Sequence, residues 1–124
     1  MRAAEARAVA LLIRVALRLF PLPHVVTMLT RIPRSRDRVS SAADCARAAA
    51  HAARSVAHPT CLFTSLTAFG LLARRGYAAQ MVIGAARDGG FDAHAWVTVA
   101  GVPLVPSERE YRALWSYDVT AGAR

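Results

Sequence analysis

PTCLFTSLTAFGLLARRG, residues 59–76, has the pattern of one buried helix with a cysteine in its first turn. Thr60 is a favoured N-cap residue, because its hydroxyl can accept a hydrogen bond from a first-turn amide. Apolar side chains then recur with helical spacing, which predicts a mostly buried helix over residues 61–75. Gly76 suits the position after the helix, where a left-handed backbone is common. The segment therefore predicts a core helix with Cys61 at its N-terminus.

The rest of the chain divides into a helical part and a strand part. Apolar and alanine-rich patterns upstream predict helices, at residues 3–19, 24–29 and 42–57. The predicted helix at residues 24–29 is followed by a basic loop at residues 31–38. Ser41-Ala42-Ala43-Asp44 has capping-box form, with Asp in place of the usual Glu. Alternating patterns downstream predict antiparallel strands, at residues 77–85, 91–100 and 102–105, and the turn residues at 86–90 predict that the first two pair as a hairpin.

This order of elements predicts an α+β fold. A chain of 124 residues with 55% hydrophobic content can form one domain with a substantial core. We therefore expect a single domain over residues 1–124, with a helical N-terminal region at 1–40. Residues 106–124 contain several aromatic side chains, but no element is assigned to them.

Composition restricts the classes of partner and site. The net charge is +8 and every Lys or Arg position is an arginine, which favours anionic partners such as an acidic peptide, a membrane surface or nucleic acid. An all-arginine set can equally arise from coding bias. Cys45 and Cys61 are both expected to be reduced. Since no zinc-ligand spacing and no glycine-rich phosphate loop occur, we expect neither a metal nor a cofactor.

The first 20 residues predict an amphipathic helix. Arg14 and Arg18 interrupt the apolar run, and Pro21-Leu22-Pro23 stands where a secretory signal would have small residues. Arg7 lies on nearly the same side of the helix as Arg14 and Arg18. Such a helix either only packs on the domain or also docks a partner or a membrane surface. We expect no integral membrane segment and a cytoplasmic location.

A histidine in the second predicted strand is the natural partner of Cys61. In Ala93-His94-Ala95-Trp96-Val97, strand alternation places His94, Trp96 and Thr98 on one face. Cysteine attacks as a thiolate, which a helix N-terminus and a nearby imidazole both favour. The Cys61 amide would also form half of an oxyanion hole. Taken separately, Cys61 could be a buried apolar thiol and His94 a packed strand residue.

Four segments together carry a family likeness: Cys61–Leu66, Leu71–Tyr77, Val82–Gly84 and Ala93–Val97. In order and spacing they resemble the lasso-peptide leader peptidases, the transglutaminase-like protease parts of lasso-peptide maturation B proteins. The likeness covers roughly residues 45–105. It implies a papain/transglutaminase-like core, in which N-terminal helices and a nucleophile helix pack on a small antiparallel sheet, with residues 41–124 as the catalytic core.

The resemblance also implies an activity. The family members are cysteine proteases that remove the leader from a ribosomally made lasso-peptide precursor, with Cys61 here as nucleophile and His94 as base and then acid. The implied partners are the precursor's leader region, a separate leader-recognition protein and the lasso cyclase. No cofactor, metal or nucleic acid is implied.

The third member of the triad stays open at this point. The family carries an aspartate on the strand after the histidine, whereas residues 102–108 contain none. Glu108 could hold the imidazole from slightly further along, Asp92 could do so less favourably, and a polar or water-mediated group is the remaining option. Two other functions also stay open: a different acyl-transfer enzyme on the same scaffold, such as an amidase or transglutaminase, and a non-enzymatic, arginine-rich binding module.

Overall fold

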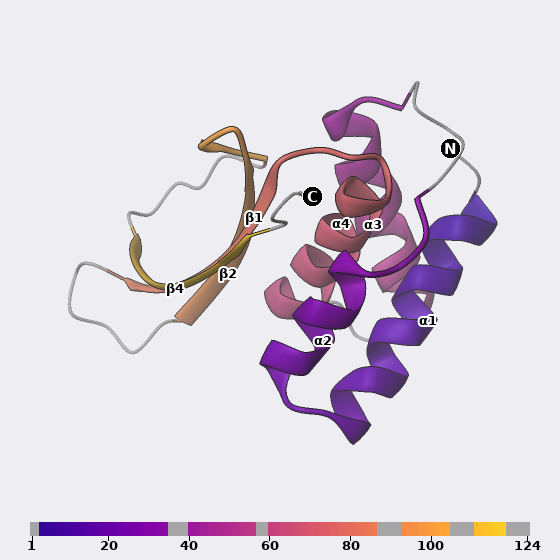
Figure 1. Ribbon diagram of the computed structural model, residues 1–124, viewed down its shortest axis with the longest axis horizontal. Coiled ribbons are helices and arrows are strands. Elements are labelled where there is room, and N and C mark those ends of the chain that lie inside the picture. Colours follow the sequence, from indigo (N-terminus) through magenta and orange to yellow (C-terminus); the bar gives the residue numbers. More distant parts are fainter. Residues whose placement is uncertain (1–2, 35–39, 57–59, 87–92, 105–110, 119–124) are drawn as a thin grey trace.

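The computed structural model describes residues 3–34, 40–56, 60–86, 93–104 and 111–118. Within these residues, four helices form a layer on one side of a four-stranded antiparallel sheet, which confirms the α+β fold (Figure 1). The helices are α1 (Ala3–Leu19), α2 (Leu22–Thr30), α3 (Ala42–Val56) and α4 (Cys61–Arg74). The strands are β1 (Ala79–Ala86), β2 (Ala93–Val99), β3 (Val102–Pro103) and β4 (Tyr111–Asp118), in the sheet order β3-β2-β1-β4.

Helix α4 is the centre of the molecule, since it contacts the other three helices and both central strands. Its N-terminus is capped as predicted, with Thr60 Oγ1 accepting from the Phe63 amide at 3.1 Å. Its C-terminus is a Schellman motif: Gly76 has a φ of 79°, and Tyr77 N donates to Leu72 O at 3.1 Å. Both ends of the buried helix are therefore set by local sequence.

The helical layer is built from small side chains. Helix α3 buries Cys45 together with three alanines, and α1 buries three alanines with Val9 and Ile13. Such side chains allow the helix backbones to approach closely around α4. Helix α2 begins at Leu22, two residues earlier than predicted, because a proline is tolerated in the first turn of a helix.

The predicted capping box of α3 is confirmed. Asp44 N donates to Ser41 Oγ, and Ser41 N donates to Asp44 Oδ2, both at 3.1 Å. The second of these bonds, from the Ser41 backbone, lowers the pKa of the Asp44 carboxyl below its ordinary value. The start of α3 is therefore fixed by the carboxylate form of Asp44.

The sheet grows from the predicted hairpin. Strands β1 and β2 pair antiparallel, with Gly84 opposite His94 and Ile83 opposite Ala95. Ala100 and Gly101, with φ values of 54° and 83°, form the two-residue turn into β3. The predicted hairpin turn after Ala86 lies outside the described residues.

Strand β4 is an addition to the prediction. It pairs antiparallel with the free side of β1, with a register shift between Ile83 and Gly84. The sequence pattern predicts no element for this segment, and its partner strand lies about 25 residues earlier in the chain. No helix in the described residues is both long and apolar enough to cross a membrane.

Candidate active site

Cys61 is the first residue of α4 and its side chain is exposed, whereas Cys45 is buried in the middle of α3. Neither cysteine forms a disulfide within the described residues. The position of Cys61 places its sulfur beside the first-turn amides of a helix whose remaining length is mostly buried. Cys61 thus combines access for a substrate with a position at the positive end of the helix dipole.

His94 lies in an aromatic stack on the sheet. Its ring stacks on Trp96 with the centroids 5.8 Å apart, and on Tyr111 with the centroids 4.7 Å apart. The neighbouring Trp96 was expected from strand alternation, whereas Tyr111 of β4 was not identified. Its place on the face of His94 depends on the register shift between β1 and β4, for which the sequence carries no local signal. The stack restricts the orientation of the imidazole.

The two faces of β2 have different surroundings. Ala95 and Val97 are buried in the core that the helices share with the sheet. His94 and Trp96 therefore lie on the other face, above Gly84 and Val82 of β1. The predicted division of this strand into two faces is confirmed, and the tertiary structure assigns the alanine and valine face to α4.

The start of α4 nevertheless lies beside the edge of β2 next to His94. Ser65 Oγ donates a hydrogen bond to Ala95 O at 3.0 Å. Val97 O, two residues further, accepts from Leu104 N on the β3 side, so both carbonyls point to this outer edge. Cys61 precedes Ser65 by one helical turn on the same side of the helix. The structure therefore brings Cys61 and His94 to the same end of the sheet.

The thiol and the imidazole are not bonded to each other. Within the described residues, no hydrogen bond joins Cys61 Sγ to His94, whose ring lies on the sheet face away from α4. Strand β3 pairs with β2 only at Thr98 and Val99, and the described residues place no further strand outside β2 at His94. The direct route between the two side chains runs around this strand edge.

Both candidates for the third triad member, Glu108 and Asp92, lie outside the described residues. A carboxylate is present elsewhere on the face of His94: Asp118 Oδ1 accepts from Gln80 Nε2 at 2.8 Å, and Gln80 Oε1 accepts from Thr98 Oγ1 at 3.4 Å. Thr98 is four residues from His94, roughly 13 Å along the strand. Asp118 therefore does not orient the imidazole.

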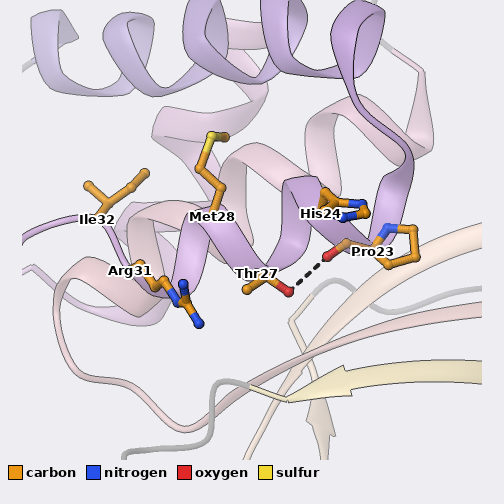
Figure 2. A pocket seen from close by; sticks show the side chains of 6 residues that line it. All are labelled: Pro23, His24, Thr27, Met28, Arg31 and Ile32. Carbon is orange, nitrogen blue, oxygen red and sulfur yellow. Dashed lines mark hydrogen bonds between the residues drawn. The ribbon is translucent and has the colours of Figure 1, made fainter.

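Two surface pockets lie beside α2, and neither is lined by Cys61 or His94. One, of about 670 Å³, runs along α2 and is lined by Pro23, His24, Thr27, Met28, Arg31 and Ile32 (Figure 2). A second, of about 660 Å³, shares Thr27 and Arg31 with it and reaches the end of β4 at Asp118. In the described part of the chain, no group of three or more His, Cys, Asp or Glu side chains could hold a metal ion.

Comparison with known proteins identifies a family. The family model Transglut_core3, described as transglutaminase-like superfamily, matches residues 7–116, which include most of α1, the Cys61 helix and most of β4. No curated protein and no solved structure matches the chain. The family match covers the helical layer and the sheet together.

Proposed function

The chain belongs to the transglutaminase-like superfamily, and on this premise we propose that it is the leader peptidase of a lasso-peptide pathway. The superfamily contains cysteine peptidases and transglutaminases, and its fold generally indicates a cysteine-type acyl-transfer enzyme. The observation that carries the proposal is the exposed Cys61 on the first residue of buried α4, beside the strand edge next to His94.

The proposed reaction proceeds by acyl transfer. The thiolate of Cys61 attacks the scissile carbonyl carbon, and the Cys61 amide donates to the oxygen that becomes negatively charged. His94, protonated when the thiolate forms, gives its proton to the departing amine, which is the new N-terminus of the core peptide. Water, losing a proton to His94, then attacks the thioester. This step releases the leader as a carboxylate and regenerates Cys61.

This mechanism requires the imidazole to reach the sulfur around the edge of β2. At His94, β2 has no described strand on its outer side, because β3 pairs further along at Thr98 and Val99. This supports the proposal, since the His94 side chain can rotate around the edge of β2 without meeting another described strand. On this route the imidazole leaves its stack on Trp96 and Tyr111. Glu108 is proposed as its orienting carboxylate, with Asp92 as the alternative.

The proposed partners follow from the proposed activity. The substrate is the leader region of the precursor, presented by a separate leader-recognition protein, and the freed amine is passed to the lasso cyclase. We place the reaction in the cytoplasm, where precursor synthesis occurs.

The test is cleavage of the precursor, followed by mass spectrometry, in the presence of the leader-recognition protein. Cys61→Ala is expected to lower cleavage by at least about 10³-fold, since removal of a nucleophile abolishes the covalent path. Its circular dichroism spectrum should match the wild type. Cys45→Ala is the matched control and should retain cleavage. Wild-type cleavage by Cys61→Ala would exclude the proposed mechanism.

A transglutaminase or amidase remains the second candidate, because the same superfamily contains such acyl-transfer enzymes. Added primary amines would then compete with water for the thioester. Isopeptide products in the same mass spectra, exceeding hydrolysis, would favour this reaction over leader removal.

A further inference from the structure

The outer face of α1 and the residue that follows it form an exposed apolar ridge. Its members are all large and between 41% and 67% exposed: Leu11, Leu12, Val15, Leu19 and Phe20. Leu11, Val15 and Leu19 recur every fourth residue and so form one row along the helix. A contiguous apolar surface of this kind is uncommon on a protein with no partner for it.

The ridge is not needed for the packing of α1. The helix already buries a separate apolar face against the core, in which Ala10 and Ile13 are fully inaccessible. Helix α1 lies on the outer side of the helical layer, on the far side of α4 from the sheet (Figure 1). The ridge therefore faces outward, away from the sheet that carries His94.

The charges around the ridge are positive. Arg7, Arg14 and Arg18 are exposed and follow one side of α1 next to the ridge. Glu5 is the one acidic residue of this helix, and it is paired with Arg74 and Arg75. With a net charge of +8 on the whole chain, the ridge is suited to an anionic partner.

The amino-acid composition of the ridge favours an anionic membrane over an acidic protein as its partner. Protein interfaces derive most of their binding energy from Trp, Tyr and Arg, and Leu and Val are under-represented among their central residues. This ridge is aliphatic except for Phe20 at its end. Aliphatic side chains flanked by arginines are typical of helices that lie at the headgroup and acyl-chain boundary of an anionic bilayer.

A second copy of the chain fits the ridge less well. In an antiparallel pairing of two α1 ridges, the arginine sides of both copies would meet and repel each other. We infer that the outer face of α1 binds peripherally to a membrane surface that contains anionic lipid. In this orientation the sheet face with His94 points away from the lipid and stays open to a peptide in water.

Sedimentation with lipid vesicles tests the inference. Wild-type protein should bind vesicles of phosphatidylcholine with about one third phosphatidylglycerol at least roughly tenfold more strongly than pure phosphatidylcholine vesicles. The double variant Val15→Glu/Leu19→Glu should lose on the order of tenfold in binding to the anionic vesicles, because it removes apolar contact.

The matched control is Val102→Glu/Leu114→Glu, which changes the net charge equally at exposed apolar residues of the sheet. It should bind nearly as well as the wild type. Equal losses in both double variants, or no sedimentation of the wild type with anionic vesicles, would overturn the inference. A wild-type dimer that Val15→Glu/Leu19→Glu dissociates, without vesicle binding, would assign the ridge to a second copy. Precursor cleavage without vesicles should be unchanged in both variants, which separates this inference from the proposed function.

Discussion

At the scale of single residues, Ser65 links the two proposed catalytic groups. It lies one turn after Cys61, and its hydroxyl donates to the carbonyl of Ala95, the neighbour of His94. One side-chain hydrogen bond thus sets how the start of α4 lies against the edge of β2. Ser65 is a positioning residue in this arrangement.

We predict that Ser65→Ala lowers kcat/KM for precursor cleavage by roughly tenfold while the free energy of unfolding falls by only about 1 kcal/mol. The loss should appear in kcat, because the substitution displaces the imidazole and leaves the peptide contacts in place. Steady-state kinetics and urea denaturation measure the two effects. Thr64→Ala, at a half-buried neighbour, is the control. Full activity in a destabilised Ser65→Ala protein would show that the bond is purely structural.

At the scale of elements, β1 has room for the aromatic stack only because Gly84 has no side chain. A Cβ built at Gly84 would lie 2.5 Å from Arg112 O of β4 and 2.8 Å from the ring of Trp96. Gly84 also lies at the register shift between β1 and β4 and opposite His94. The pairing of β1 with β2 and β4 and the position of His94 therefore both depend on the absence of a side chain at Gly84.

Gly84→Ala is expected to displace β4 or Trp96. The added methyl group would overlap the Arg112 backbone on one side and the Trp96 ring on the other, and neither can move without a cost in free energy. Overpacking of this kind costs about 1–3 kcal/mol, measured here as a shift in the urea midpoint. The near-UV circular dichroism of the aromatic stack should change, and precursor cleavage should fall. Gly101→Ala is the control, because its positive φ is strained but no atom lies within 4 Å of its added Cβ. An unchanged near-UV spectrum in Gly84→Ala would contradict this account of β1.

At the scale of the whole molecule, one carboxylate joins the first turn of α1 to the last turn of α4. Glu5 Oε2 lies 2.6 Å from Arg74 Nη1, and Glu5 Oε1 lies 2.7 Å from Arg75 Nη2. The side chain of Arg75 is 1% exposed, and that of Glu5 is 16% exposed. The Glu5 carboxylate therefore balances the charge of the buried Arg75 guanidinium, and it fixes α1 to the end of α4.

Glu5→Gln should lower the free energy of unfolding by about 3 kcal/mol, because it takes a carboxylate counter-ion away from the buried Arg75 guanidinium. Urea denaturation followed by circular dichroism measures this change. Arg47→Gln, which removes an exposed ion pair with Asp44, should have little effect. Equal stabilities of the two variants would mean that the Glu5 cluster does not secure α1.

Much of the fold was predictable because its signals are local. The caps of α4 and α3 lie within four residues of the groups they bond, and the β1–β2 hairpin joins neighbouring segments. Strand β4 was not predicted, since it pairs with β1 across a long stretch of intervening chain, and pairing at that distance leaves no local pattern. Tyr111 was missed for the same reason, since its place beside His94 depends on that pairing and on its register shift.

What the sequence by itself determined is the set of helices and the hairpin, the start of α4 at Cys61, and the shared face of His94 and Trp96, because caps and periodicity act between near neighbours. Only the tertiary structure decided which face of β2 packs on the helices, that Ser65 meets the strand edge beside His94, and that α1 keeps a second apolar face outside. These three features depend on which surfaces become buried, and burial is decided by contacts between elements that are distant in the sequence.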